Sequence, residues 1–278
     1  MTEKDTKALK IVNLEHKYDK ELALCDISIE IEKGEKIAII GPNGAGKTTL
    51  FLHMNGTFKS KKNTIFINGK DITEMNIKER IRNVGVVFAD PDDQLFMPSV
   101  YDDIAFGPNN LGLKNEEVEE RVKDAVEMMG IKDLIDKVPH HLSMGQKKKV
   151  ALASVLSLRP KILILDEPTA NLDPKSKKDI MNIIKRLNDK GITTIISTHD
   201  INLLPNLADK IYLLNKRILK VGTPEEVFEE EDLLNENNLE APEIYKLFKE
   251  IKKLNLRIEY EKIPVTFDEA IEIVKKSV

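Results

Sequence analysis

The sequence has few of the features that mark secreted, membrane-spanning or nucleic-acid-binding proteins. Its 278 residues include one cysteine, Cys25, which excludes a disulfide within the chain and fits a reducing compartment. Its longest apolar runs, such as IAII and KILIL, fall far short of the roughly 18 to 20 residues of a membrane span. The first ten residues are polar and charged, so no secretory signal is expected. A net charge of −4 offers no basic surface for nucleic acid.

The hydrophobic pattern predicts an α/β fold. Hydrophobic residues make up 41% and charged residues 32% of the chain, as in ordinary globular proteins. Strict alternation in CDISIEIEKG predicts an antiparallel sheet with one face in water. KIAII, NVGVVF, KILILD, TTIIST and KIYLL are nearly continuous apolar runs, which are typical of parallel strands buried on both faces. Helices are expected between them, including Asn115–Met129, Ser143–Leu158 and Pro174–Asp189.

The chain is expected to contain a large unit followed by a small one. Residues 8–228 form the main domain, with a helical subdomain at about residues 90–158. Residues 229–278 form an acidic linker and a small α/β C-terminal extension. We interpret the linker as a solvated hinge, and KKK at Lys147–Lys149 as a solvated helix face.

The segment GPNGAGKTT is a phosphate-binding loop placed between a predicted strand and a predicted helix. Glycines allow backbone N–H groups to approach a polyphosphate, and the following helix N-terminus favours negative charge. Lys47 is expected to neutralise the β- and γ-phosphates, and the Thr48 hydroxyl to bind Mg²⁺. The residues assigned to this loop are Gly41, Pro42, Asn43, Gly44, Ala45, Gly46, Lys47, Thr48 and Thr49.

Three further segments carry chemistry. ILILDEP places Asp166 and Glu167 at the C-terminal end of a buried strand, where open α/β sheets bind ligands. Asp166 would hold Mg²⁺ through water, and Glu167 would act as the general base. Ser143, in LSMGQ, either caps a helix or binds an anion at the helix N-terminus. His199, in STHD, is either structural or orients the attacking water.

These motifs, in this order, resemble those of the ATP-binding cassette ATPases over about residues 11–227. The resemblance implies a P-loop NTPase core, ATP and Mg²⁺ as ligands, and a head-to-tail dimer with a second ATPase subunit. Ser143 and Gly145, with Gln146, would then contact the ATP of the partner, and Asp173 would link the two sites. Tyr18 matches the aromatic that stacks on adenine, although an ordinary strand-edge tyrosine is the alternative.

The segment DPDDQLF and the C-terminal IPVTFDEAI resemble the energy-coupling-factor group, whose ATPases drive uptake of cobalt, nickel or vitamins. This implies an integral membrane partner, a position on the cytoplasmic face of the membrane, and no nucleic-acid partner. The alternatives are a soluble cassette that remodels nucleic acid or ribosomes, and a small-molecule kinase with a phosphate-binding loop.

The sequence departs from the family pattern at two positions. Met144 replaces a glycine in the signature, and Ala89 stands where the family has a glutamine that senses Mg²⁺ and the attacking water. An alanine side chain cannot bind either. We therefore expect either that Asp90 or Gln94 supplies the missing polar contact, with Gln94 as a candidate Mg²⁺ ligand, or that sensing is weakened.

Overall fold

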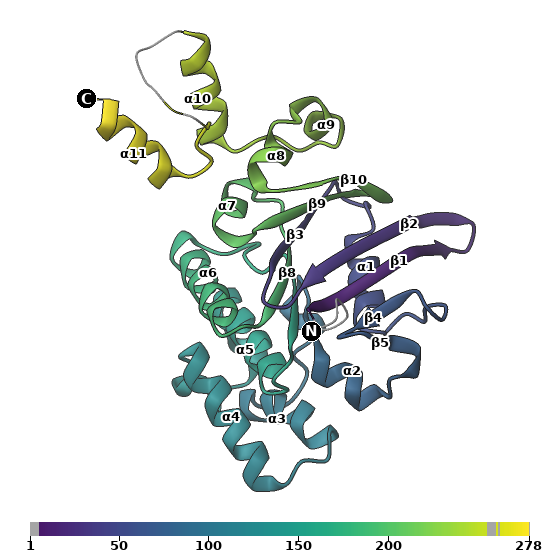
Figure 1. Ribbon diagram of the computed structural model, residues 1–278. Coiled ribbons are helices and arrows are strands. Elements are labelled where there is room, and N and C mark those ends of the chain that lie inside the picture. The colour runs from purple at the N-terminus through teal and green to yellow at the C-terminus, as the bar shows by residue number, and fades with distance from the viewer. Residues whose placement is uncertain (1–5, 255–259, 261, 278) are drawn as a thin grey trace.

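A computed structural model describes residues 6–254, 260 and 262–277, and it contains two sheets flanked by helices (Figure 1). The larger sheet has the order β10-β9-β3-β8-β7-β6, and its strands are parallel except β10, which runs antiparallel to β9. Its strands are β3 (Lys36–Ile40), β6 (Val84–Val87), β7 (Ile162–Asp166), β8 (Thr193–Ser197), β9 (Lys210–Asn215) and β10 (Arg217–Gly222). The predicted α/β core with buried parallel strands is confirmed.

The smaller sheet is antiparallel, as the alternating pattern predicts. Its order is β2-β1-β4-β5. The strands are β1 (Lys7–Tyr18), β2 (Glu21–Glu32), β4 (Ile65–Ile67) and β5 (Lys70–Asp71). On β2, Ile27, Ile29 and Ile31 are buried while the residues between them are exposed. The buried face packs with α1 (Lys47–Met54) against the larger sheet in one hydrophobic cluster.

Several helices are inserted along the chain between β6 and β7, in the span expected to form a helical subdomain. They include α3 (Val100–Asn110), α4 (Asn115–Met129) and α5 (Met144–Leu156), which pack with the later helix α6 (Pro174–Asp189) on one side of the larger sheet. Figure 1 shows α3, α4 and α5 grouped together. The remaining short helices of the core are α2 (Ile77–Asn83) and α7 (Leu204–Leu207).

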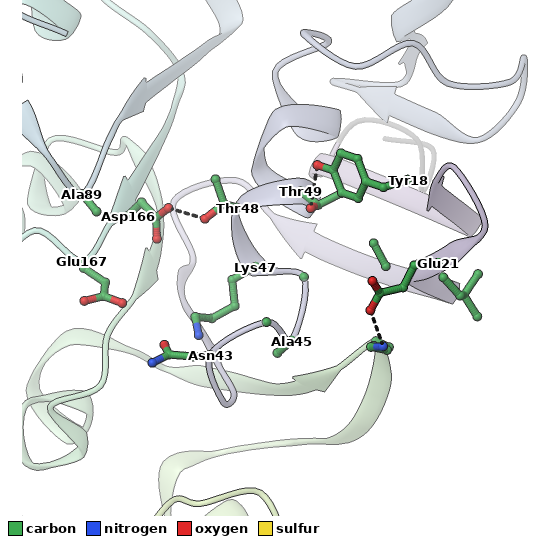
Figure 2. Close-up of a pocket in the computed structure, with 15 residues that line it drawn as sticks. Tyr18, Glu21, Asn43, Ala45, Lys47, Thr48, Thr49, Ala89, Asp166 and Glu167 are labelled. Atoms are coloured by element: carbon green, nitrogen blue, oxygen red, sulfur yellow. Dashed lines mark hydrogen bonds and ion pairs between the residues drawn. The ribbon is translucent and has the colours of Figure 1, made fainter. Parts of the chain in front are cut away.

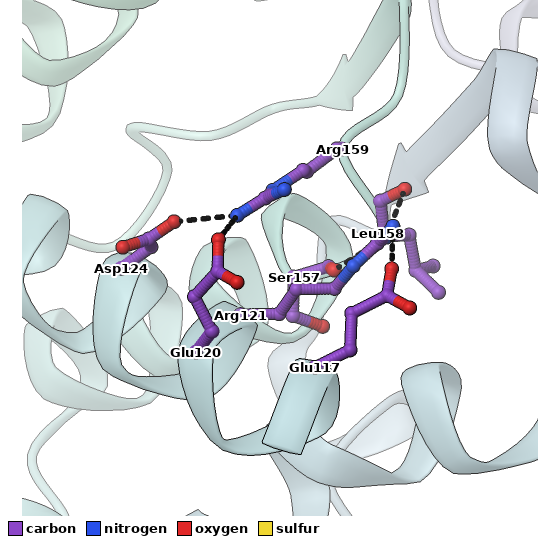
Figure 3. A network of polar contacts seen from close by, with 7 residues as sticks. All are labelled: Glu117, Glu120, Arg121, Asp124, Ser157, Leu158 and Arg159. Carbon is purple, nitrogen blue, oxygen red and sulfur yellow. Dashed lines mark hydrogen bonds and ion pairs between the residues drawn. The ribbon is translucent and has the colours of Figure 1, made fainter. Parts of the chain in front are cut away.

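Arginines fasten α4 to the end of α5 (Figure 3). The Arg121 guanidinium donates to the carbonyl groups of Ser157 and Leu158 at 3.4 and 3.3 Å, and to Glu117 at 2.8 Å. These bonds satisfy carbonyl groups that a helix end leaves without intrahelical partners. Arg159 adds two exposed ion pairs with α4, to Glu120 and Asp124. The subdomain is thus tied at the end of α5 opposite to Ser143.

The acidic segment after residue 228 is not a solvated hinge, and that interpretation is wrong. It contains α9 (Glu231–Glu236), which follows α8 (Pro224–Phe228) and precedes α10 (Glu243–Lys253) and α11 (Phe267–Ser277). Leu234, Leu239 and Ala241 are buried in one cluster with Ile40 of the larger sheet and Phe228. The acids occupy the solvent side of a short amphipathic segment, which the charge count alone could not reveal. In the C-terminal extension, the segment LRIEYEKI (256–263) is strand-like in sequence, and most of it lies outside the described residues.

Candidate functional site

A cleft opens at the C-terminal ends of the parallel strands (Figure 2). Its volume is about 370 Å³, which is enough for a small-molecule ligand. Figure 2 shows Tyr18 and Glu21 on one side of the phosphate-binding loop and Ala89, Asp166 and Glu167 on the other. The lining residues are Tyr18, Glu21, Leu22, Ala23, Asn43, Gly44, Ala45, Gly46, Lys47, Thr48, Thr49, Ala89, Asp166, Glu167 and Lys216. The predicted loop residues from Asn43 to Thr49 therefore share one cleft with both carboxylates, while Gly41 and Pro42 do not line it.

The loop between β3 and α1 is built from close backbone contacts. A Cβ at Gly41 would lie 2.0 Å from the Leu214 carbonyl oxygen, and a Cβ at Gly46 would lie 2.7 Å from that of Ala23. Gly46 also has a φ of 98°, which favours glycine. It precedes α1 without a side-chain cap, so the first N–H groups of this helix have no capping acceptor. Such a helix start attracts phosphate oxygens.

Lys47 is held inside the loop. Its Nζ donates to the carbonyl oxygens of Gly41 at 2.8 Å and Pro42 at 3.1 Å. Burial lowers the pKa of Lys47, whereas the nearby charges of Glu167 and Asp166 raise it. Two neutral carbonyl partners leave the positive charge uncompensated by direct contact. A phosphate in the cleft would supply the negative charge that compensates Lys47.

Hard oxygen ligands meet beside the loop. The Thr48 hydroxyl donates to Asp166 Oδ2 at 2.8 Å, and the Ser197 hydroxyl donates to Asp166 Oδ1. The described residues hold no group of three or more His, Cys, Asp or Glu side chains that could bind a metal alone. Mg²⁺ is usually bound by one or two protein oxygens together with substrate phosphates. The Thr48–Asp166 pair therefore fits Mg²⁺ that arrives with a nucleotide.

Glu167 and His199 form a pair at the edge of the cleft. His199 Nε2 lies 2.9 Å from Glu167 Oε1, and both side chains are partly exposed. Glu167 has a φ of 46°, a left-handed conformation that non-glycine residues seldom adopt. Its N–H is held by the carbonyl oxygen and the hydroxyl of Ser197, at 3.2 and 3.0 Å. This arrangement can hold a carboxylate and an imidazole next to a water molecule.

Tyr18 lies at the far rim of the cleft. Its ring is 49% exposed, and its hydroxyl is 3.1 Å from the Thr49 hydroxyl. Behind it, His16 stacks on Phe58 with ring centroids 4.9 Å apart, and His16 Nδ1 lies 2.9 Å from His53 Nε2. The tyrosine thus presents an open ring on a packed aromatic base.

The buried histidine of this cluster should make stability depend on pH. Burial, with a smaller contribution from His16, lowers the pKa of His53 from 6.5 to about 4. Between these values the unfolded chain binds a proton that the folded chain does not, so the free energy of unfolding falls as pH decreases. The wild-type free energy of unfolding should therefore fall between about pH 7.5 and about pH 5. In His53→Gln this fall should be smaller by about 2 kcal/mol. Urea unfolding at both pH values measures this difference.

His141 provides the control, since it is exposed. His141→Gln should leave the pH dependence of the wild type unchanged. Equal pH dependence in the wild type and His53→Gln would contradict the assignment.

The signature residues lie outside this cleft. Ser143 caps α5, and it forms a reciprocal capping box in which its N–H donates to Gln146 Oε1 at 3.0 Å. The capping alternative is therefore confirmed for the isolated chain. Gly145 leaves no room for a Cβ, which would lie 2.8 Å from the Ser176 hydroxyl. Asp173 caps α6, and hydrogen bonds to Ser176 lower its pKa. Neither helix start lines the cleft of its own chain.

The expected substitute for the missing glutamine is not at the site. Gln94 Nε2 donates to the Ala151 carbonyl at 3.0 Å and to the Ser154 hydroxyl at 3.1 Å, and its Oε1 accepts from Phe88 N–H. Both amide N–H bonds go to α5 and the oxygen accepts from the β6 end, and Gln94 does not line the cleft, so the expectation that it binds Mg²⁺ is corrected to a packing role. Ala89 does line the cleft, but only with a methyl group.

Asp90 is also engaged away from the cleft. Its carboxylate accepts from Asp92 N–H at 2.9 Å and caps the short 3₁₀ helix Pro91–Asp93. Asp92 in turn accepts two hydrogen bonds from Lys147 at 2.7 and 2.9 Å. The acids of this segment therefore fold it and tie it to α5.

Sequence reasoning missed two charged residues on the Tyr18 side of the cleft and one buried lysine. Glu21 and Lys216 line the cleft and form an ion pair at 3.4 Å. Nothing in their local sequence separates them from other turn residues. Lys148, assigned to a solvated face, is only 2% exposed.

Comparison with known proteins gives consistent matches. A family model described as ABC transporter matches residues 24–170. The energy-coupling factor transporter ATP-binding protein EcfA of Methanocaldococcus jannaschii is 47% identical over 246 residues, which are 87% of this chain and 88% of that protein. EcfA of Methanococcus maripaludis is 46% identical over 252 residues, covering 88% of this chain and 90% of that protein.

Solved structures agree in fold. The structure of cbiO1 from Clostridium perfringens, described as part of the ABC transporter complex cbiONQ, has a TM-score of 0.74 and 41% identity; it covers 88% of this chain and 99% of that one. A dimeric ATP-binding cassette in a post-hydrolysis state, bound to ADP and Pi, has a TM-score of 0.69 and 25% identity. It covers 78% of this chain and 98% of that one.

Proposed function

Because the chain belongs to the ABC transporter family, as an ATP-binding ATPase of the energy-coupling factor type, we propose that it powers uptake of a transition-metal ion or a vitamin. The observation that carries the site assignment is the shared cleft, in which the phosphate-binding loop faces Asp166 and Glu167. We assign residues 8–228 to the ATPase unit. The substrate class comes from the resemblance to this group of importers. The names of the relatives do not favour a soluble cassette that remodels nucleic acid or ribosomes.

In this proposal, each side of the cleft binds one part of ATP. The open Tyr18 ring receives the adenine, while the loop N–H groups and Lys47 hold the phosphates. Mg²⁺, when bound at Thr48 and Asp166, supplies positive charge that stabilises the phosphates. Figure 2 shows Tyr18 and Asp166 on opposite sides of the loop, which supports this division of the nucleotide between them.

Glu167 and His199 act on the water. The Glu167 carboxylate accepts a proton from the water that attacks the γ-phosphorus, so that the new P–O bond forms as the bond to the β-phosphate oxygen breaks. His199, 2.9 Å from Glu167 Oε1, fixes the orientation of that carboxylate. The left-handed backbone at Glu167 keeps the side chain at the cleft edge.

A second ATPase subunit completes the site. Ser143, Gly145 and Gln146 lie at an exposed helix start outside their own cleft, which supports binding to the ATP of a partner subunit. Asp173 stands at the neighbouring helix start and would lie at the same interface. The partner is either a second copy of this chain or a homologous chain.

An exposed aromatic pair supports docking to a membrane subunit. The described residues contain no helix long and apolar enough to cross a membrane. Phe96 and Phe106 are 61% and 42% exposed, and their rings pack edge to face with centroids 5.0 Å apart. The buried Asp103 carboxylate accepts from the Phe96 and Met97 N–H groups and fixes this surface beside the segment that begins at Ala89. We place the integral membrane subunit here, with the ATPase at the cytoplasmic face.

Replacing both aromatic residues tests this docking. The double variant Phe96→Ser with Phe106→Ser should weaken association with the membrane subunit by at least about 30-fold, because buried aromatic anchors dominate interface energies. Co-purification from solubilised membranes measures the loss, and ATP binding by the isolated chain should change by less than about twofold. Ile77→Ser, at an exposed apolar residue of α2, is the control. Retention of the double variant on membranes would contradict the proposed surface.

A further inference from the structure

Lys148 is a buried cation that connects two loops of the active cleft. It lies on α5, is 2% exposed, and its Nζ donates to the Glu167 carbonyl oxygen at 2.7 Å and to the Ala89 carbonyl oxygen at 3.0 Å. Its neighbours differ, since Lys147 pairs with Asp92 and Lys149 with Asp179 through more exposed side chains. Of these three lysines, only Lys148 donates to residues that line the cleft.

Burying this cation has a cost that its contacts must offset. Burial lowers the pKa of Lys148, and the charges of Glu167, Asp90 and Asp166 oppose that effect. An apolar residue would avoid the cost of desolvation but would leave two carbonyl groups without this donor. A lysine therefore costs more free energy to bury here than an apolar residue would. An apolar residue, however, could not donate hydrogen bonds to the two carbonyl groups.

The two carbonyl groups lie at equivalent places on neighbouring strands. β6 and β7 are parallel partners, and Ala89 and Glu167 follow their C-terminal ends. Both residues line the cleft. The Glu167 backbone is held on its N–H side by Ser197 and on its C=O side by Lys148, across a residue with a φ of 46°. Lys148 and Ser197 thus clamp the two sides of a strained residue.

We propose that Lys148 is a positioning residue for ATP hydrolysis, which holds the Glu167 backbone in its left-handed conformation and links it to α5 and to Ala89. The inference rests on the proposed role of Glu167 as the base. Because Ser143 caps the start of α5, the lysine ties the catalytic loop of one ATP site to the helix start that serves the other. The Ala89 side chain offers no polar contact, so this link runs through its backbone carbonyl instead.

Three variants separate positioning from packing. Lys148→Met keeps the length and removes the donor, Lys148→Gln keeps a neutral N–H donor, and Lys149→Met is the control on the same helix. We expect kcat for ATP to fall about 100-fold in Lys148→Met and about 10-fold in Lys148→Gln, since small misplacements of reacting groups cost this much. The dissociation constant for ATP should stay within about twofold of the wild type in all variants, and Lys149→Met should keep its kcat.

The outcomes are distinct. A wild-type kcat in Lys148→Met overturns the proposal, as do equal losses of kcat and ATP affinity in both variants with a lowered Tm, which would assign a packing role. If Lys148→Met does not fold, Lys148→Gln decides: a reduced kcat with normal ATP affinity supports positioning, and an unchanged kcat overturns it. Glu167→Gln is assayed in parallel. Turnover in that variant would contradict the proposed base, whereas an inactive Glu167→Gln beside a fully active Lys148→Met contradicts this inference alone.

Discussion

Glu167→Gln should bind ATP with the affinity of the wild type and lose at least about 100-fold of its turnover. The glutamine amide has nearly the size of the carboxylate but cannot accept a proton from the attacking water. It also replaces the carboxylate oxygen Oε1, which lies 2.9 Å from His199 Nε2. Because the phosphate-binding loop is unaffected, ATP should remain bound and hold two subunits together. Phosphate release measures turnover, and size-exclusion chromatography with ATP measures the dimer.

A carboxylate elsewhere in the cleft provides the matched control. Glu21 lines the same cleft on the side of Tyr18, and its side chain is largely exposed. Glu21→Gln should keep turnover within about twofold, because it changes charge in the cleft without touching the reacting atoms. A Glu167→Gln chain that hydrolyses ATP normally, or that stays monomeric with ATP, would contradict the proposed base or the proposed dimer respectively.

Gly41→Ala should strongly weaken ATP binding by deforming the phosphate-binding loop. The added Cβ would lie 2.0 Å from the Leu214 carbonyl oxygen, a backbone atom of β9 that cannot rotate away. The loop must therefore shift, and with it the carbonyl that holds Lys47 Nζ at 2.8 Å. We expect at least about a 100-fold loss of ATP affinity and a destabilisation of about 1–3 kcal/mol. Calorimetric titration with ATP and thermal unfolding measure the two effects.

Gly34→Ala separates this clash from the general cost of replacing a glycine. Gly34 has a φ of 78°, yet a Cβ there would meet no atom within 4 Å. This variant should lose about 1 kcal/mol of stability through backbone strain and keep its ATP affinity. Similar ATP affinities for Gly41→Ala and the wild type would show that the loop can open without loss of function.

Local sequence was sufficient for the elements whose signal is short-range. The alternation in β2 and the apolar runs of β3, β7 and β8 predict their sheets, since side-chain period follows directly from strand geometry. The glycine-rich loop and the Asp166–Glu167 pair are likewise contiguous motifs. Their meeting in one cleft follows from the rule that parallel strands of a sheet present their C-terminal ends at one edge.

Local sequence failed where a residue has two possible environments. Gln94 was expected near the nucleotide, but its amide is bound to α5. The acidic segment after residue 228 was expected in water, but Leu234 and Leu239 bury one of its faces. In both cases the residue types are those expected, but the direction in which the side chains point is not. That direction depends on neighbours that only the folded chain brings close.

The sequence by itself determined the phosphate-binding loop, the carboxylate pair and the alternation of strands and helices, because each depends on residues that are adjacent along the chain. Only the tertiary structure decided which of three consecutive lysines enters the core. Lys148 reaches Glu167 and Ala89, which lie 19 and 59 residues away along the chain. A charged side chain is buried only where distant segments bring hydrogen-bond acceptors to it, and no local sequence pattern predicts such contacts.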